Sequence, residues 1–358
     1  MSLADIIAQK IKEHGPMSVA EYMSLALSEP YLGYYMRKDP LGAEGDFTTA
    51  PEISQIFGEL IGAWIAQQWM HLGMPDAALI ELGPGRGTLM ADALRATKHI
   101  AGFHSSLTVH LVETSPALKH KQWNALAKTH PHIEWHETIN ALPDDKPWLL
   151  IANEFFDALP IRQFMHKDNM WHERMVDVDN SEFIFSVMPA EADIQKKLDS
   201  GFRRNDGEII ELCEPALEIL RVIGEHIATK GGAAMIADYG YIGGTNGDTL
   251  QAVKNHKYHN VLKDAGEADL TAHVDFSALM EVAQHAGATV YGPYPQGRVL
   301  GKLGAIPRAT RLCEGLTQEG QATIMSGLKR LLAPDEMGEL FKMMCIMPKH
   351  HPTPEGFE

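Results

Sequence analysis

The 358-residue chain is long enough for one large domain with additions or for two domains, and its 45% apolar and 22% charged residues argue against a disordered or fibrous protein. A formal net charge of −16 and the lack of a long Lys/Arg run argue against nucleic acid as a direct partner. Cys213, Cys313 and Cys345 form no CxxC pair, so neither a structural zinc site nor a disulfide framework is indicated.

The amino-terminal segment indicates no secretion. MSLADIIAQKIKEHG carries acidic residues in an amphipathic pattern and lacks the basic end and apolar block of a secretory signal. No stretch of the chain approaches the roughly 18 uncharged apolar residues of a membrane-spanning helix. We therefore expect a cytoplasmic protein without membrane insertion.

Two helices are predicted at the start, over residues 2–14 and 18–28, around the break at Gly15 and Pro16. The second begins with a capping Ser18, followed three residues later by an acidic residue.

A long irregular loop is expected next, over residues 28–54, because this stretch is rich in Gly, Pro and aromatic residues. A helix with a wide apolar face follows over residues 51–72. Asp46, Thr48 and Thr49 lie just before it. They either cap this helix or belong to a lid over a cofactor.

Four short apolar runs then alternate with helix-length segments. They cover residues 78–83, 107–113, 148–154 and 232–240. Strands that are apolar on both faces and alternate with helices indicate a parallel sheet covered on both sides. The predicted fold class is α/β, with a doubly wound, Rossmann-like sheet.

The remaining segments extend this sheet. An inserted antiparallel unit begins with a hairpin that turns at residues 167–169. The other expected elements are a helix over 215–229, a polar loop over 241–260 that forms part of an active site, a helix over 275–286, a strand over 289–294, helices within 305–333 and a last strand over 341–347.

The predicted domain organisation follows from these elements. Residues 1–75 form a helical extension with the lid loop, and residues 76–347 form the main domain. This domain carries insertions at about 160–230, of α+β type, and at about 305–335, of helical type. A disordered tail is expected over 348–358.

The glycine-rich stretch LIELGPGRGTLM (residues 79–90) directly follows the first apolar run. A phosphate-binding P-loop is excluded, because no Gly-Lys-Ser/Thr follows at the required spacing. The dinucleotide motif needs a third glycine where Thr88 stands, which weakens that interpretation. Glu81, Gly83, Gly85 and Gly87 match the acidic-x-Gly-x-Gly-x-Gly pattern of class I S-adenosylmethionine (SAM) methyltransferases. A simple strand-to-helix turn remains the alternative.

Glu113 ends the second apolar run, 26 residues after Gly87. A carboxylate at this strand end can accept both hydroxyls of a ribose. Glu113 therefore supports a nucleoside ligand without choosing between SAM and a dinucleotide.

A second polar cluster, NEFFD, ends the third apolar run. If a helix begins there at once, Glu154 and Asp157 share one face of it. Together with Asn153 and the two phenylalanines they would form a clamp for a cationic group. The alternative is that Asn153 or Asp157 caps a helix and the phenylalanines are core residues.

Other kinds of chemistry have little support in the sequence. His256 and His259 lack two further ligands at metal spacing, so we predict no metal. There is no Gly-x-Ser-x-Gly motif for acyl transfer.

With these motifs in view, the chain resembles one family over most of its length, about residues 15–347. The segments that carry the resemblance are GDFTTAPEISQIFGE, ELGPGRGTLM, VETSP, ANEFFDALPIRQF, ADYGY, DLTAHVDF and QGRVLG. The family is the MidA family, which includes the mitochondrial arginine methyltransferase that assists assembly of respiratory complex I.

The resemblance implies a SAM-dependent methyltransferase with an added subdomain. It assigns SAM binding to Gly83, Gly85, Gly87 and Glu113, and suggests protein arginine as substrate, with a subunit of a respiratory complex as a candidate. The chain lacks the Thr-His-Trp triplet and the glutamate-bracketed hairpin of better-known arginine methyltransferases, so any arginine clamp is built differently. A homodimer is left open.

The functional hypothesis is that Glu154 and Asp157 hold an arginine guanidinium for in-line attack on the methyl group of SAM. The alternatives are a small-molecule methyltransferase, an NAD-dependent dehydrogenase and a non-catalytic SAM-binding assembly factor.

Overall fold

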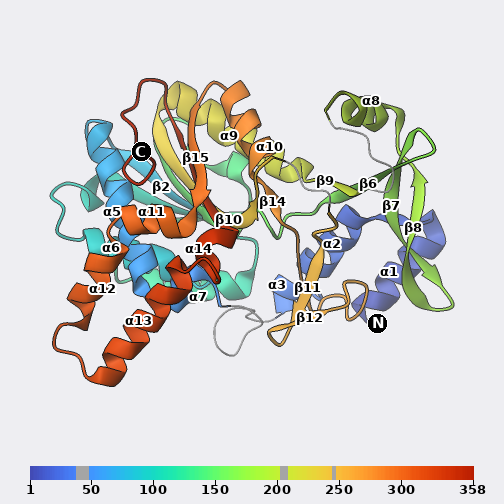
Figure 1. The fold of residues 1–358 in the computed structure, drawn as a ribbon, viewed down its shortest axis with the longest axis horizontal. Helices are drawn as coiled ribbons and strands as arrows, with labels where there is room; N and C mark the ends of the chain where they lie inside the picture. Colours follow the sequence, from blue (N-terminus) through green and yellow to red (C-terminus); the bar gives the residue numbers. More distant parts are fainter. Residues whose placement is uncertain (38–47, 202–208, 244–246) are drawn as a thin grey trace.

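The computed structural model describes residues 1–37, 48–201, 209–243 and 247–358. Its centre is an eight-stranded sheet in which seven strands follow the order β15-β16-β10-β5-β2-β3-β4, and β14 pairs with the end of β10 (Figure 1). These strands are β2 (Ala77–Leu82), β3 (Leu107–Val112), β4 (Ile133–His136), β5 (Trp148–Asn153), β10 (Gly232–Tyr241), β14 (Val274–Asp275), β15 (Thr289–Pro295) and β16 (Phe341–Met347). The four predicted apolar runs are β2, β3, β5 and β10, and the predicted last strand is β16.

The direction of the strands places the ligand crevice. Strands β4, β3, β2, β5 and β10 are parallel, while β16 runs antiparallel to β10 and β15. From β2 the chain first builds outward through β3 and β4, and then crosses to the other side of β2 to form β5 and β10. In open α/β sheets, such a reversal opens a crevice at the carboxyl ends of the strands.

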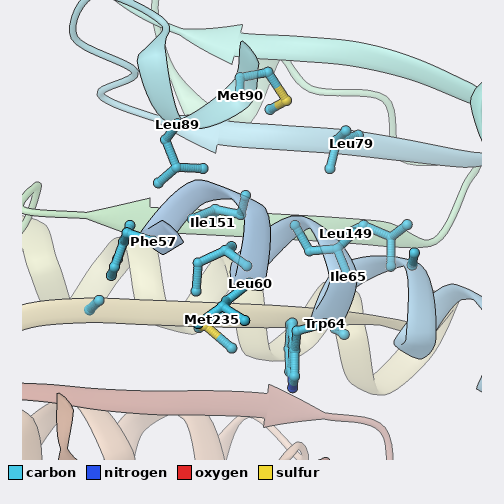
Figure 2. Packing of buried hydrophobic residues seen from close by; sticks show 14 of the residues in the cluster. Phe57, Leu60, Trp64, Ile65, Leu79, Leu89, Met90, Leu149, Ile151 and Met235 are labelled. Atoms are coloured by element: carbon cyan, nitrogen blue, oxygen red, sulfur yellow. The ribbon is translucent and has the colours of Figure 1, made fainter. Parts of the chain in front are cut away.

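Helices cover both faces of this sheet. Successive residues of a strand point to opposite faces, and Leu149 and Ile151 accordingly join one buried cluster while Leu150 joins another. Figure 2 shows the first cluster, in which Leu60 and Trp64 of α5 pack near strands β2, β5 and β10. The helices on this face include α5 (Gln55–His71), α6 (Thr88–Thr97), α11 (Gln296–Lys302), α12 (Ala305–Cys313) and α13 (Gln318–Leu332).

The opposite face is covered chiefly by α9 (Glu214–Lys230) and α10 (Phe276–His285). Leu220 and Ile223 of α9 are fully buried against strand residues such as Ile80 and Leu150. Two covered faces explain why the strands are apolar throughout rather than alternating. The α/β prediction is confirmed.

The amino-terminal helices pack away from the central sheet. They are α1 (Leu3–His14) and α2 (Val19–Ser28), and each begins with a complete capping box; that of α2 joins Ser18 and Glu21. Their buried residues form a separate cluster with Val176 of the inserted sheet and Leu270. The short strand β1 (Met17–Ser18) pairs with the inserted sheet.

The insertion is an antiparallel sheet of order β1-β7-β6-β9, with β8 paired to β7. Its own strands are β6 (Arg162–Lys167), β7 (Met170–Asp179), β8 (Glu182–Pro189) and β9 (Ile209–Leu212), and α8 (Ala192–Gly201) packs on it. The predicted hairpin turn lies at Asp168 and Asn169, both at positive φ (52° and 59°) as a tight turn requires.

Several local predictions differ from the structure. The helix expected over 51–72 is interrupted at Ser54, giving α4 (Ala50–Ile53) before α5. The segment expected to be a polar loop contains β11 (Gln251–Lys254) and β12 (Lys257–His259), which form a small sheet with β13 (Asp269–Thr271). These strands are too short and too polar to show an apolar pattern.

The carboxyl-terminal segment, expected to be disordered, lies against the domain. Phe357 is only 2% exposed and belongs to the core cluster of α5 and α11. Arg298 and Lys302 of α11 hydrogen-bond to the terminal residue, Glu358. One apolar side chain and two basic partners therefore hold a segment whose composition suggests disorder.

The smaller helices are α3 (Tyr34–Arg37), α7 (Pro116–Leu126) and α14 (Met337–Leu340). Within the described ranges, no helix has the length and apolar character required to cross a bilayer.

Candidate active site

A cavity of about 550 Å³ lies at the carboxyl ends of the parallel strands, where the strand order reverses. Its wall contains the last residues of β2, β3 and β5 and Tyr239 of β10, together with parts of α2, α3, α4 and α9 and the loop after β4. Eight predicted site residues line it: Glu81, Gly83, Gly85, Glu113, Asn153, Glu154, Asp157 and Thr49. Gly87 and Thr48 are not in this wall, and Asp46 lies outside the described residues.

The glycine loop follows β2 without an intervening residue. Gly83, Gly85 and Gly87 all have positive φ (60°, 54° and 81°), which side-chain-bearing residues rarely adopt. A Cβ atom at Gly83 would also lie 2.8 Å from the ring of Phe155, another residue of the cavity wall. Gly87 is the residue before α6. The third predicted glycine therefore shapes the turn rather than the cavity.

Glu113 is held in place by the helix that follows it. One carboxylate oxygen accepts the backbone N–H of Ser115 (2.8 Å) and the other accepts the side-chain N–H of Gln122 (3.0 Å). Gln122 also donates to the carbonyl of Gly85 (2.8 Å) and accepts from the indole of Trp135 (2.8 Å). This fully buried amide thus connects the glycine loop to Glu113. Burial raises the pKa of Glu113, while these hydrogen bonds act against the rise.

Glu81, near the end of β2, is a buried acid, and few interactions offset the cost of burying it. Its side chain is 3% exposed, and its Oε2 atom finds no hydrogen-bond partner among the described residues. Burial raises its pKa to about 8. A buried acceptor without a donor is costly unless a ligand supplies one.

The NEFFD segment forms a turn instead of the expected helix. Glu154 has a φ of 50°, and its Oε1 accepts the backbone N–H of Ala50 (2.8 Å) and the amide of Asn153 (3.3 Å). Thr49 precedes α4 but makes no capping hydrogen bond with its side chain, so Glu154 meets the N-terminus of that helix. Burial raises the pKa of Glu154 to about 8.

Asp238, on β10, accepts the hydrogen bonds that hold this turn. Its Oδ2 accepts the consecutive backbone N–H groups of Phe155 (3.2 Å), Phe156 (2.9 Å) and Asp157 (3.3 Å), and its Oδ1 accepts that of Tyr239 (2.9 Å). The Asp238 side chain is fully buried. Burial, and then the neighbouring Asp157 and Glu154, raise the pKa of Asp238.

Asp157 emerges from the same turn into the cavity. It is 6% exposed, and its Oδ1 has no hydrogen-bond partner among the described residues. Burial raises the pKa of Asp157, and a hydrogen bond from Tyr239 acts against the rise. The turn therefore directs two raised-pKa carboxyl groups, Glu154 and Asp157, into one space.

Replacing Asp238 tests whether it holds the turn. Asp238→Ala is expected to lower the free energy of unfolding by at least about 2 kcal/mol, because buried N–H groups lose their acceptor. Asp238→Asn keeps one acceptor oxygen and should lose less. Urea denaturation measures both. Equal stability of Asp238→Ala and the unchanged protein would show that other groups satisfy these N–H donors.

The cavity wall is strongly acidic. Its described residues carry eight carboxyl groups, on Glu52, Glu81, Glu113, Glu137, Glu154, Asp157, Glu218 and Asp269. The one Lys or Arg side chain among them, Arg86, lies 3.5 Å from Glu52. An acidic, partly desolvated space of this kind favours a ligand with positive charges and hydrogen-bond donors.

Comparison with known proteins identifies the family. A family model described as "Putative S-adenosyl-L-methionine-dependent methyltransferase" matches residues 60–294. The chain is 38% identical to the zebrafish protein arginine methyltransferase NDUFAF7, over 97% of this chain and 87% of the relative. For the human protein of that name the identity is 37%, over 95% and 82%. The chain belongs to this methyltransferase family.

A solved structure agrees. A Burkholderia thailandensis protein bound to S-adenosyl-homocysteine is 26% identical to this methyltransferase, with a TM-score of 0.83 over 99% of this chain and 92% of the other. The resemblance drawn from the motifs is confirmed, and the cofactor is SAM. The alternative of an NAD-dependent dehydrogenase is therefore wrong.

The cavity fits this cofactor. SAM carries an ammonium group, a sulfonium centre and two ribose hydroxyls, and therefore needs acceptors and negative charge. The wall supplies both, including buried oxygens of Glu81, Asn153 and Asp157 that lack a donor among the described residues.

One prediction is overturned by these relatives. The sequence led us to expect a cytoplasmic protein, whereas the zebrafish, fruit fly and human relatives are all named as mitochondrial proteins. The cytoplasmic assignment came from the absence of a recognisable targeting pattern, and such an absence is weak evidence of location.

One group of possible metal ligands lies in the described part of the chain, although the sequence led us to predict no metal. The ligand atoms of His110, Glu134 and His136, on β3 and β4, lie within 4.8 Å of one another. His110 Nδ1 and His136 Nε2 are 2.9 Å apart and can share a hydrogen bond, which gives both rings a partner without an ion.

Several residues of the methyltransferase cavity were missed by sequence analysis. Tyr35 and Asp269 line it, and Gln122 organises it from outside. Tyr239 also lines the cavity, and its position beside Asp238 at the end of the fourth apolar run does indicate a polar rim there. Asp269 lies in the segment DLTAHVDF, whose local pattern shows no link to the sheet edge.

Proposed function

We propose that this methyltransferase transfers a methyl group from SAM to a guanidinium nitrogen of an arginine in a protein. The observation that carries the proposal is the convergence of Glu154 and Asp157 on the cavity that the glycine loop also lines. The names of the relatives, which are protein arginine methyltransferases, support the same substrate. A respiratory complex subunit is the first protein substrate that we would test.

The proposed division of the cavity follows the order of the strands. Glu113, at the end of β3, accepts the ribose hydroxyls, and Glu81, at the end of the neighbouring β2, accepts the ammonium group. Gly83 and Gly85 let the backbone approach the cofactor. Asn153, Glu154 and Asp157 follow at β5, on the other side of β2, and face the reacting end. Thr49, the residue before α4, also lines the cavity, and we propose that it and the neighbouring Thr48 contact the cofactor.

In this scheme the carboxyl groups bind and orient the arginine. A guanidinium has a pKa above about 12, so no side chain can deprotonate it before the reaction at neutral pH. Its positive charge instead favours the ionised forms of Glu154 and Asp157. These carboxylates then turn one nitrogen toward the methyl group, and most of the acceleration comes from this orientation.

The same carboxylates take the proton. When bound, SAM supplies an electrophilic methyl group on sulfur, and the nitrogen that accepts it must lose a proton during or after transfer. Either Glu154 or Asp157 is suited to accept this proton, because burial has already raised the pKa of both groups.

A labelling experiment tests the proposal. The protein is incubated with methyl-labelled SAM and an extract of its own source cells, and the expected result is a labelled protein band whose acid hydrolysate contains methylarginine. Excess S-adenosylhomocysteine should abolish the band. Label confined to the low-mass fraction would indicate a small-molecule methyltransferase, and no label at all a non-catalytic SAM-binding protein.

Sedimentation velocity on the purified methyltransferase tests for a homodimer.

A further inference from the structure

Two cavity residues come from segments outside the central sheet. Tyr35 lies on α3, and Asp269 begins β13 of the small three-stranded sheet; Figure 1 shows α3 and the neighbouring strands β11 and β12 apart from the central strands. The Tyr35 hydroxyl donates to both carboxylate oxygens of Asp269, at 2.9 and 3.1 Å. Asp269 is only 4% exposed. A buried, hydrogen-bonded carboxyl group therefore forms part of the wall.

This part of the wall is tied to the NEFFD turn. The backbone N–H of Ala272, directly after β13, donates to the carbonyl of Asp157 (2.9 Å). Gln251 of β11 donates to the hydroxyls of Tyr239 (3.4 Å) and Thr271 (3.3 Å). The Asp269 wall thus keeps a defined position relative to Asp157.

Tyr35 interacts electrostatically with two acidic residues of the cavity wall, Asp269 and Asp157. Burial raises the pKa of Tyr35, and the charges of Asp269 and then Asp157 raise it further. The Tyr35 hydroxyl therefore stays protonated at physiological pH and lies within electrostatic reach of both carboxyl groups. Asp157 and Asp269 approach one space from two different elements, the turn after β5 and strand β13.

The shape of a guanidinium suits such an arrangement. It is planar and presents five N–H donors in a fixed fork, so it can contact carboxylates on two walls at once. An ammonium group presents its three donors from a single point. An ionised carboxylate has about four lone-pair positions, so accepting a tyrosine hydroxyl does not exhaust its capacity.

We propose that Asp269, positioned by Tyr35, is the second wall of the arginine site. It binds the guanidinium nitrogens that do not receive the methyl group, while Glu154 and Asp157 orient the one that does. This wall selects arginine over lysine. The inference rests on the proposed function and assigns a specificity-determining role to residues outside the methyltransferase sheet.

The experiment uses the full-length methyltransferase. Its substrate is the protein that becomes labelled in the extract, purified in unmethylated form. Asp269→Asn and Tyr35→Phe are compared with the matched controls Glu267→Gln and Tyr31→Phe, whose side chains are exposed and outside the cavity. SAM affinity, measured by isothermal titration, should stay within about twofold for all four variants. It also serves as the check that each variant is folded.

The expected result concerns the protein substrate. Asp269→Asn should raise its KM and its dissociation constant, the latter measured with S-adenosylhomocysteine present, by about 10- to 100-fold, as for loss of a hydrogen-bonded charge. Tyr35→Phe should cause a smaller rise in the same direction. A substrate with lysine in place of the target arginine should be discriminated against less by Asp269→Asn than by the unchanged enzyme.

Two results would overturn the inference. In the first, the unchanged enzyme methylates arginine while Asp269→Asn and Tyr35→Phe bind substrate as tightly as their controls; only the second wall is then wrong. In the second, the unchanged enzyme labels no protein arginine, and the proposed function fails together with the inference. If Asp269→Asn does not fold, Tyr35→Phe alone decides between these outcomes, because it removes one hydroxyl and keeps the ring.

Discussion

Asp157→Asn and Glu154→Gln are each expected to slow methylation of the protein substrate by about 100-fold or more, which is the usual range for losing a positioned proton acceptor. Both substitutions preserve size and remove the charge that orients the guanidinium. SAM affinity should change little, because the glycine loop, Glu81 and Glu113 remain. Single-turnover rates with saturating SAM measure the effect, and isothermal titration measures the affinity.

The double variant Glu154→Gln, Asp157→Asn sharpens this test. If the two carboxylates act as one clamp, the double variant should be little slower than either single one, since groups that act together are not additive. Glu225→Gln, an exposed acid on α9 paired with Arg221, is the matched control and should keep the full rate. Full methylation by both single variants, with normal SAM affinity, would remove these residues from the mechanism.

The central part of the site could be predicted because it depends on one regularity. Parallel strands end at the same edge of a sheet, so polar residues at their ends must gather there. This principle brought Glu81, Glu113, Asn153 and Glu154 together from positions up to 73 residues apart in the sequence. Each lies near or at the end of an apolar run that is easy to recognise.

The remaining part of the site depends on tertiary contacts that leave no periodic pattern. The NEFFD segment was expected to start a helix, but the buried carboxyl group of Asp238 captures its N–H groups and holds a turn. That acceptor lies more than 80 residues further along the chain. Tyr35 and Asp269 meet across an even longer separation, between a one-turn helix and a three-residue strand.

The glycine loop shows both sides of this limit. Its spacing correctly predicted a strand-to-helix turn, and the structure places two of its glycines in the cavity wall. The spacing could not show that the three glycines have different roles. All three have positive φ, but of the three only Gly83 and Gly85 line the cavity.

The buried acid at the end of β2 leads to a prediction about stability. Glu81 has its pKa raised by burial to about 8 from an ordinary value of 4.5. Between these values the folded protein holds a proton that the unfolded chain releases, so the free energy of unfolding falls as pH rises. One such group contributes a slope of about 1.4 kcal/mol per pH unit, or roughly 5 kcal/mol over the whole window.

Glu81→Gln should remove this slope in the cofactor-free protein. Urea denaturation at pH 5, 6, 7, 8 and 9 is expected to show the variant gaining stability relative to the unchanged protein by about 1.4 kcal/mol per pH unit, with little further gain above pH 8. Glu154→Gln should behave similarly, because burial raises the pKa of Glu154 to about 8 as well, whereas Glu225→Gln should not. Parallel curves for Glu81→Gln and the unchanged protein would show that Glu81 is ionised in the fold.

Bound SAM should remove the stability advantage of Glu81→Gln over the unchanged protein. A cationic group bound beside Glu81 lowers its pKa, so saturating SAM should flatten the pH dependence of the unchanged protein and raise its stability most near pH 8. Glu81→Gln lacks the charge and should bind SAM more weakly, most clearly near pH 8. A variant that is more stable without cofactor and less stabilised by it would show that Glu81 is kept for binding at the expense of the fold, as is common for functional residues.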